Sequence, residues 1–219
     1  MKKYVPILAR TQLFRGVEAC QVEAMLHCLD ARLCTYQKGE YILRQGDTLD
    51  DIVIMVEGSA HIQKDDYWGS RSILGHLEAG DMFGEAYAAP ESGPLLNDVV
   101  ATDNCAAIFF DVRRVITTCS SACVFHALVV QNMFFAICEK NKALVQKLGH
   151  MSQRSTKEKL LSYLSEEAKR QGSAAFEIPF NRQQLADFLS VDRSAMSNEL
   201  CKLRDAGIIR FARNRFELL

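Results

Sequence analysis

The sequence lacks a leading apolar segment of the kind that directs export. Its first ten residues carry two lysines and a short apolar run that Pro6 interrupts, which is too little for the core of a signal peptide. A membrane span is missing too, because the most apolar stretch, residues 122–138, holds a histidine, a glutamine and an asparagine near its middle. With eight cysteines and no export signal, we expect a cytoplasmic protein with free thiols and no membrane partner.

Clustered histidines are also missing, which bears on enzymatic function. The five histidines are scattered, and no two of them have a His-x-His or His-x-x-x-His spacing. Jelly rolls that act as metal-dependent oxygenases need such a set on adjacent strands. We therefore expect no metal site, no cofactor and no catalytic activity.

Extremes of composition are absent as well. Of the 219 residues, 48% are apolar and 24% are charged, values typical of a globular protein with a buried core. The net charge of −1 conceals an uneven distribution. Residues 151–219 hold 12 Lys and Arg against 9 Asp and Glu, so positive charge is concentrated toward the C-terminus.

The first two thirds of the chain predict an antiparallel β-roll after an initial helix. Residues 12–30 have apolar residues at three- and four-residue steps, with Cys20 and Cys28 on the apolar face. Short apolar runs follow at residues 41–43, 52–56, 61–62, 73–74 and 106–110. Glycines punctuate them at Gly39, Gly46, Gly58, Gly69, Gly75, Gly80 and Gly84. Regularly spaced strands with glycine turns favour an antiparallel roll or barrel, within an overall α+β fold.

Residues 121–149 predict a long helix with two apolar sides. One stripe recurs alternately at four and three residues: Val124, Leu128, Gln131, Phe135, Cys138, Lys142 and Val145. The second set is Phe125, Val129, Phe134, Ile137, Leu144 and Leu148. One side of such a helix can cover the roll while the other meets a twin helix, so we expect a parallel homodimer through residues 121–149.

The last third begins with a strong helix start signal. Ser155 and Glu158 form a capping box, and this helix is expected to end at Gln171, before Gly172. Residues 176–180 read as a short strand that Pro179 confines to an edge.

Two short helices joined by a tight turn follow. Asn181 caps the first helix, residues 190–192 form the turn, and Asp192 caps the second helix. The outer face of the second helix presents Arg193, Ser194, Ser197, Asn198, Lys202 and Arg204, side chains that hydrogen-bond bases and phosphates. A β-hairpin with Arg213 and Arg215 at its tip completes a winged helix-turn-helix. This ordered set predicts binding to double-stranded DNA.

Several separate segments resemble the Crp/Fnr family of bacterial transcription regulators. They are LFRGV at 13–17, KGE at 38–40, GD at 46–47, VEG at 56–58, GDMFGE at 80–85 and RQQLADFL at 182–189. The resemblance implies a jelly-roll, effector-sensing domain at 1–118, a dimerisation helix at 119–150 and a winged helix-turn-helix at 151–219. It also implies a homodimer on a pseudo-palindromic operator, with RNA polymerase as a candidate further partner.

The resemblance also assigns roles to individual residues of the DNA-binding domain. Arg193, Ser194, Ser197 and Asn198 would face bases, and Asn181 and Gln183 would lie near phosphates. The best-known members have a glutamate and a second arginine in place of Ser194 and Asn198, so their operator sequence is not transferred. Arg193 is suited to guanine and Asn198 to adenine.

The residues of the ligand-binding region depart from the pattern of members that bind cyclic nucleotides. Members that bind cyclic AMP use an Arg-Ser pair for its phosphate, and the aligned residues here are Leu95 and Leu96. Two leucines cannot neutralise a buried phosphate, so cyclic AMP is not expected. The candidate pocket for another small effector comprises Phe83, Gly84, Glu85, Tyr87, Leu95, Leu96, Phe125 and Val129.

Two alternatives remain open at this point. Cysteine-based or iron–sulfur sensing would use Cys20, Cys28 and Cys34, or Cys119 and Cys123 one helical turn apart. Core packing is the better account of the first three cysteines. From another class, the chain would be a ligand-binding adaptor that does not bind DNA.

Overall fold

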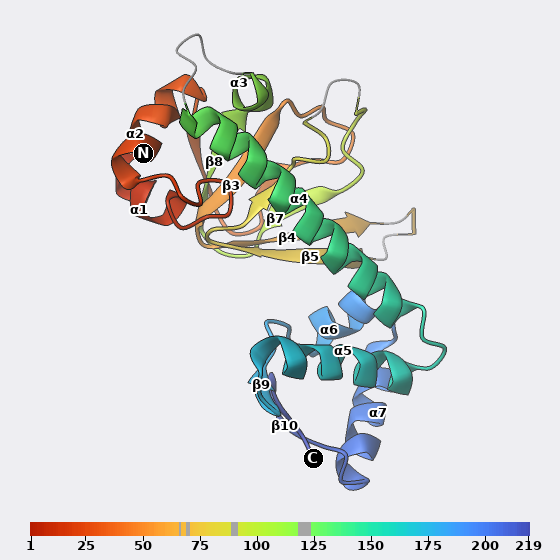
Figure 1. Ribbon diagram of the computed structural model, residues 1–219. Helices are drawn as coiled ribbons and strands as arrows, with labels where there is room; N and C mark the ends of the chain where they lie inside the picture. Colours follow the sequence, from red (N-terminus) through yellow and green to blue (C-terminus); the bar gives the residue numbers. More distant parts are fainter. Residues whose placement is uncertain (66, 69–70, 89–91, 118–123) are drawn as a thin grey trace. The chain divides into compact units, whose positions relative to one another are not determined.

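The computed structural model describes the chain apart from residues 66, 69–70, 89–91 and 118–123. It divides into two compact units (Figure 1). Residues 1–64 and 74–140 form the first unit, and residues 65–73 and 141–219 form the second. Among the described helices, none combines the length and apolarity needed to cross a bilayer.

The first unit is built on two four-stranded sheets. One sheet has the order β1-β8-β3-β6 and the other the order β2-β7-β4-β5. The strands are β1 Arg32–Tyr36, β2 Tyr41–Leu43, β3 Asp51–Glu57, β4 Ser59–Asp65, β5 Arg71–Glu78, β6 Met82–Phe83, β7 Asp98–Ala101 and β8 Cys105–Asp111. The registered pairs described between them are antiparallel, and the jelly-roll prediction is confirmed.

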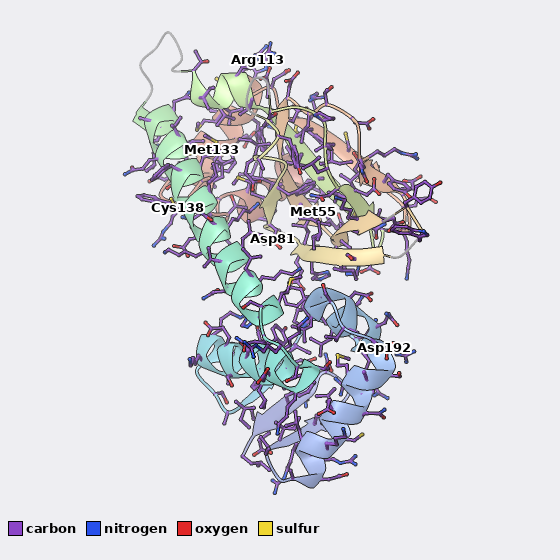
Figure 2. The ribbon with its side chains drawn as sticks, turned by 90° about the vertical axis from the view of Figure 1, so that its right-hand side faces the viewer. Met55, Asp81, Arg113, Met133, Cys138 and Asp192 are labelled. Atoms are coloured by element: carbon purple, nitrogen blue, oxygen red, sulfur yellow. The ribbon has the colours of Figure 1, made fainter. Side chains whose placement is uncertain are left out.

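The core inside the roll comes from the facing sides of the two sheets. Met55 and Phe109 contribute from one sheet, and Val99 and Ala101 from the other (Figure 2 labels Met55). Because strand side chains alternate, the neighbours of Met55 and Phe109 point to the other face of their sheet. Gly75 was expected to mark a turn, but it lies inside strand β5. A Cβ added at Gly75 would lie 3.6 Å from the side chain of Ile62.

The outer face of the β1-β8-β3-β6 sheet is covered by helices. Ile54, Ile108 and Phe110 pack there against side chains of the helical segments. The elements near the N-terminus and after β8 are the 3-10 helix η1 Lys2–Tyr4 and the α-helices α1 Val5–Leu8, α2 Ala19–Cys28 and α3 Val112–Ile116. This layer gives the roll a second core outside the sheets.

The predicted helix over residues 12–30 was wrong at its start and in its orientation. Helix α2 begins only at Ala19, because Gly16 has a φ of +79° and Glu18 forms a capping box with Gln21. Cys20 and Cys28 are consequently exposed. The apolar-face assignment of these two cysteines was therefore incorrect, and Val22, Met25 and Leu26 form the buried side instead.

Helix α4, Val124–Met151, is the long helix that the sequence predicts. Val129 and Ala136 are buried against the outer core of the first unit, and Met133 packs against it (Figure 2 labels Met133). Asn132 is buried too, and its side-chain amide donates to the carbonyls of Leu13 and Arg15 at 3.1 and 2.7 Å. One side of α4 thus covers the roll.

The expected division of α4 into two stripes was only partly right. From the first stripe, Leu128 packs against the core whereas Phe135 and Val145 are exposed. From the second, Val129 is buried whereas Phe134 is exposed. The exposed side of α4 therefore contains members of both predicted stripes. The beginning of the predicted helix, residues 121–123, lies outside the described residues.

The second unit follows the predicted order of elements. Its helices and strands are α5 Thr156–Gln171, β9 Ala175–Glu177, α6 Arg182–Leu189, α7 Arg193–Asp205, β10 Ile209–Ala212 and β11 Arg215–Leu218. Ser155 and Glu158 form the capping box of α5, and Gly172 ends it with a φ of +63°, as predicted. The three strands form a sheet of order β10-β11-β9. The strand predicted over residues 176–180 is shorter, Ala175–Glu177, and ends before Pro179, but its edge position is confirmed.

Candidate nucleic-acid interface

Helix α6 is short and fixed at its start by a reciprocal cap. The side chain of Asn181 accepts from the backbone N–H of Gln184 at 3.0 Å, and Gln184 accepts from the N–H of Asn181 at 2.8 Å. Leu185, Ala186 and Leu189 are fully buried. The amide of Gln183 donates to Asp187 at 2.8 Å. Asn181 and Gln183 are exposed, but both side chains already have a partner within the helix.

The turn between α6 and α7 is held by a lysine that sequence analysis missed. Ser190 takes a left-handed conformation, with a φ of 51°, at the end of α6. The ammonium of Lys159, on α5, donates to the carbonyls of Leu189 and Ser190 at 3.3 and 3.4 Å. A cation at this place donates to carbonyls that have no partner within the helix. It also interacts favourably with the negative C-terminal end of the helix dipole.

Helix α7 has one buried stripe and one exposed polar face. Asp192, labelled in Figure 2, caps its start by accepting from the N–H of Ala195 at 2.8 Å. Met196, Leu200 and Leu203 are buried at three- and four-residue steps. The remaining positions carry the predicted DNA-reading side chains: Arg193, Ser194, Asn198, Lys202 and Arg204 are exposed, and Ser197 is half-buried.

Three of these side chains are engaged in ways that the sequence did not indicate. Arg204 forms an ion pair of 2.9 Å with Asp205. The hydroxyl of Ser194 donates to the carboxylate of Asp192 at 2.5 Å, and this hydrogen bond lowers the pKa of Asp192. Lys202 forms an ion pair of 2.6 Å with Glu199. Arg193 has no carboxylate within ion-pair distance among the described residues. Its guanidinium is thus available to an external acceptor.

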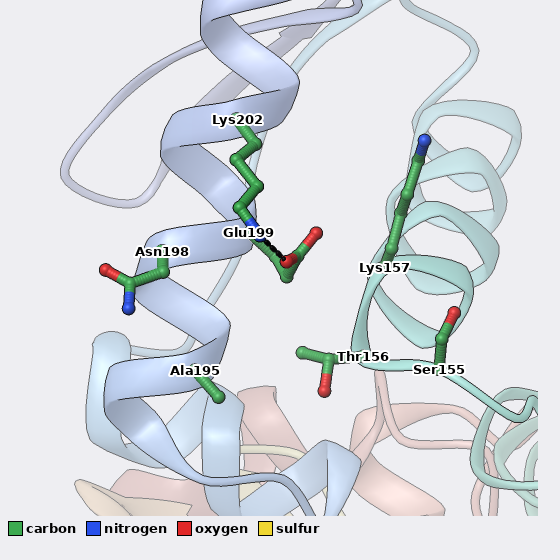
Figure 3. Close-up of a pocket in the computed structure, with 7 residues that line it drawn as sticks. All are labelled: Ser155, Thr156, Lys157, Ala195, Asn198, Glu199 and Lys202. Atoms are coloured by element: carbon green, nitrogen blue, oxygen red, sulfur yellow. Dashed lines mark hydrogen bonds and ion pairs between the residues drawn. The ribbon is translucent and has the colours of Figure 1, made fainter.

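An open pocket of about 550 Å³ lies between the start of α5 and the polar face of α7. It is lined by Ser155, Thr156, Lys157, Ala195, Asn198, Glu199 and Lys202. Figure 3 shows Thr156 and Lys157 on one wall, with Glu199 and Lys202 opposite. Asn198 and Lys202 were predicted as DNA contacts, whereas the α5 residues were not, because their sequence signal was fully explained by helix capping.

The chemistry of this pocket is that of an anion site with one acidic member. Two lysines and an asparagine amide supply donors, and the N–H groups at the start of α5 add a positive helix dipole. The carboxylate of Glu199 accepts from Lys202 and offsets part of this charge. Such a set suits the phosphate backbone of a nucleic acid that lies along α7.

The predicted wing is a two-stranded hairpin with a tight turn. Strands β10 and β11 pair through Ala212 and Arg215, so Arg213 and Asn214 form the turn. Arg213 has a φ of 54° and is exposed. Arg215 is also exposed but lies 3.5 Å from the carboxylate of Glu177. Both arginines therefore lie at the wing, as predicted, and Arg215 shares its charge with an acid on β9.

Arg182 joins the wing to α6. Its guanidinium lies 4.8 Å from the ring centroid of Phe211 and 5.1 Å from that of Phe216, within cation–π range. Burial lowers the pKa of Arg182, and its Nη1 is buried with no hydrogen-bond partner among the described residues. We interpret Arg182 as a residue that positions the wing.

The effector candidates of the first unit begin at a glycine turn. Gly84 has a φ of +85°, and a Cβ there would lie 2.7 Å from the Leu49 side chain. The next residue, Glu85, forms an ion pair of 2.8 Å with Lys140 of α4, whose ammonium also donates to the carbonyl of Met82. The second oxygen of Glu85, Oε2, is buried without a described hydrogen-bond partner. No sequence pattern indicated a role for Lys140.

The eight predicted effector residues are not all brought together. Phe83 and Leu95 belong to the core inside the roll, with Tyr87 packed against it. Val129 belongs to the outer core, and Phe125 packs there. Leu96 is 58% exposed. Because the β1-β8-β3-β6 sheet separates the two cores, a single pocket containing all of these apolar residues does not form in this structure.

The cysteines considered for sensing are dispersed. Cys20 and Cys28 are exposed on α2, and Cys34 is half-buried beside the core inside the roll. Burial raises the pKa of the Cys105 thiol. Within the described part of the chain, no three His, Cys, Asp or Glu side chains converge on a metal position. Cys119 and Cys123 lie outside the described residues.

Comparison with known protein families matches each unit separately. Residues 33–121 match the cyclic nucleotide-binding domain, and residues 158–219 match the Crp-like helix-turn-helix domain. A cAMP-dependent protein kinase regulatory subunit of Mycosarcoma maydis is 32% identical to this chain over 82 residues. That similarity covers 37% of this chain and only 15% of the kinase subunit.

Two regulators resemble the chain over both units. The transcriptional activator protein FnrL of Cereibacter sphaeroides is 24% identical over 184 residues, which is 80% of this chain and 71% of FnrL. The structure of the c-di-GMP responsive global regulator CLP from Xanthomonas campestris superposes with a TM-score of 0.71 at 15% identity. It covers 92% of this chain and 99% of CLP. With a cyclic nucleotide-binding domain followed by a Crp-like helix-turn-helix domain, the chain belongs to the Crp/Fnr family of transcription regulators.

Proposed function

We propose that the chain is a homodimeric regulator that reads a pseudo-palindromic DNA site through α7 and the wing. The observation that carries this proposal is the exposed face of α7, which presents Arg193 and Asn198 opposite a fully buried apolar stripe. A helix of this kind enters the major groove, and a two-fold dimer places two such helices one turn of DNA apart.

Base reading in this proposal is assigned to two side chains. Arg193 reads guanine, because its guanidinium has no acidic partner among the described residues and matches the two acceptors of that base. Asn198 reads adenine through its amide. Ser194 and Ser197 are assigned secondary base contacts. The Ser194 hydroxyl has to break its hydrogen bond to Asp192 before it can donate to a base.

Phosphate contacts are assigned to the pocket and to the wing. Lys157 and Lys202 line the pocket beside α7, and Arg213 and Arg215 lie at the wing. Phosphate contacts of this kind fix the position and orientation of the reading helix on the duplex. Asn181 and Gln183 stay predicted phosphate neighbours, although the backbone N–H of Asn181 already donates to the side chain of Gln184.

The effector is proposed to be a small molecule other than cyclic AMP. Leu95 is only 4% exposed and is part of the roll core, so the place of a phosphate-binding arginine is filled by packed hydrocarbon. Glu85 is already neutralised by Lys140. A ligand that reaches this ion pair changes a contact between the roll and α4, the helix proposed to form the dimer, and thereby shifts the equilibrium between dimer states.

Selection of DNA ligands from random duplexes tests the proposal. The full-length chain is expected to enrich a two-fold symmetric site whose half-sites are separated by about one helical turn. A variant with Arg193→Ala and Asn198→Ala should lose that enrichment and keep the fold. Failure of the unaltered chain to enrich any symmetric site, with and without cell extract, would favour the ligand-binding adaptor.

A cysteine-based response is the second candidate, and the exposure of Cys20 and Cys28 favours it. Exposed thiols are accessible to oxidants, whereas buried ones are largely inert. Cys20→Ser and Cys28→Ser together should remove any change in DNA affinity caused by peroxide. An unchanged peroxide response would exclude these two thiols.

A further inference from the structure

The exposed side of α4 carries a heptad repeat with one polar interruption. Starting at residue 127, alternating steps of three and four residues reach an apolar series whose members are exposed or half-buried: Ala127, Val130, Phe134, Ile137, Leu144 and Leu148. Phe134 and Leu148 are 62% and 64% exposed. The same steps place Asn141 between Ile137 and Leu144, in an a position of the heptad.

The two asparagines of α4 contrast sharply in their surroundings. Asn132 is buried on the roll side, where two backbone carbonyls accept its amide hydrogens. Asn141 is exposed on the other side, and no described residue forms a hydrogen bond with its side chain. It is the one polar residue in a seam that is otherwise apolar from residue 127 to residue 148.

We infer that Asn141 fixes the register and orientation of the homodimer by pairing with Asn141 of a second copy. This inference rests on the proposed homodimer and adds a specificity-determining residue to it. In a parallel, in-register pair of α4 helices, each a position meets its own equivalent. The two Asn141 amides can then donate and accept across the two-fold axis.

Other pairings of the same seam leave Asn141 without a partner. A shift by one heptad places it opposite Phe134 or Leu148, and an antiparallel pair centred near Ile137 places it opposite Phe134. An amide buried against hydrocarbon loses its hydrogen bonds to water and gains none. Asn141 therefore lowers the stability of the seam slightly and selects one arrangement, as a single polar a residue does.

The flanking charges are compatible with this arrangement. Lys140 and Lys147 occupy the positions beside the seam, but the Lys140 ammonium is held by Glu85 at 2.8 Å and that of Lys147 donates to the carbonyl of Ile73 at 3.2 Å. Both ammonium groups are thus engaged within their own chain. The occupant of the seam is thus a second copy of this chain, whose surface is self-complementary to it.

Mixing of charged variants tests the inference on the full-length chain. Asn141→Asp and Asn141→Lys place like charges opposite each other in their own homodimers and opposite charges in a mixed dimer. Each variant alone should dissociate at least tenfold more readily than the unaltered chain. An equimolar mixture carrying two different tags should form mixed dimers well above the statistical half share, measured by native mass spectrometry.

The matched control uses Ala143, which is exposed on α4 but lies off the seam. Ala143→Asp and Ala143→Lys should dimerise like the unaltered chain and mix statistically. If the unaltered chain dimerises but the Asn141 variants mix statistically, the register role is overturned and the homodimer stands. If the unaltered chain stays monomeric at 100-fold the concentration used for DNA binding, the proposed homodimer itself is overturned, and this inference with it.

Discussion

The helix-turn-helix of the second unit and the effector region of the first unit are built in opposite ways. Every side chain assigned to base reading comes from one helix, α7, and its geometry follows from local caps at Asp192 and Asn181. The effector region combines a glycine turn at Gly84 with an ion pair between Glu85 and a lysine 55 residues away on α4. One surface is encoded locally, and the other exists only after distant segments have packed.

This difference shows where each region is vulnerable. In the helix-turn-helix, a substitution on the exposed face changes contacts with DNA and leaves the fold intact, because the buried stripe is separate. Near Gly84, by contrast, the backbone itself is crowded, and the Glu85 carboxylate depends on Lys140. Substitutions there are expected to affect stability before they affect binding.

The largest expected effect is on the glycine turn. Gly84→Ala adds a Cβ at 2.7 Å from Leu49 and at a φ of +85°, so unfolding should become easier by roughly 2–4 kcal/mol from backbone strain plus overpacking. Gly39→Ala is the matched control, because Gly39 has a φ of +88° but no neighbour within 4 Å. It should cost only about 1 kcal/mol. Equal losses in urea unfolding of both variants would show that crowding at Gly84 is unimportant.

The next effect concerns base reading. Arg193→Ala should weaken binding to the selected site by about 1–3 kcal/mol and relax the preference at one base pair in each half-site. The unfolding midpoint should be unchanged, since Arg193 is exposed. Competition with operators substituted one pair at a time measures the preference. A uniform loss across all operators would reassign Arg193 to a phosphate.

A smaller effect is expected at a half-buried cation of the second unit. Lys147 stacks on Phe188 at 4.1 Å from the ring centroid, and burial lowers its pKa from 10.5 to about 8. Between these two values the unfolded chain binds more protons than the folded one, so this lysine makes stability rise with pH from about 8 to 10.5.

Lys147→Met should therefore remove that rise and stabilise the chain at pH 7 by about 1 kcal/mol, after allowance for solvent screening of a partly exposed group. The exposed Lys169→Met is the control and should keep the slope. Urea unfolding at pH 7 and pH 10 supplies the comparison. A steeper rise with pH in Lys147→Met would contradict the assigned role of burial.

The smallest effect separates wing from helix. Arg213→Asn keeps a residue type that tolerates a φ of 54° but removes one cation. Binding should weaken by a similar factor on every DNA sequence, and the slope of log affinity against log salt should fall by about 0.9 for each protomer of the bound dimer. Arg215→Ala should change the slope less, because Glu177 already shares its charge. Sequence-dependent losses in either variant would place the wing in base reading.

The sequence predicted the second unit well, for identifiable reasons. Ser155, Asn181 and Asp192 act as caps within three residues of their partners, so short-range patterns were sufficient to locate three helices. The roll was also predicted as a class, because its short apolar runs and glycine turns repeat regularly. The beginning of α2 was misplaced because Leu13 and Val17 are buried in turns, which a helical period cannot distinguish from a helix.

What the sequence determined by itself was the order of the elements, their caps and the polar face of α7, since each depends on residues a few positions apart. The tertiary structure alone decided that Lys140 neutralises Glu85, that Lys159 holds the turn before α7, and that Val129 and Leu95 belong to different cores. The physical reason is that pairing and burial depend on which distant surfaces meet, and a periodic pattern shows only that a surface exists.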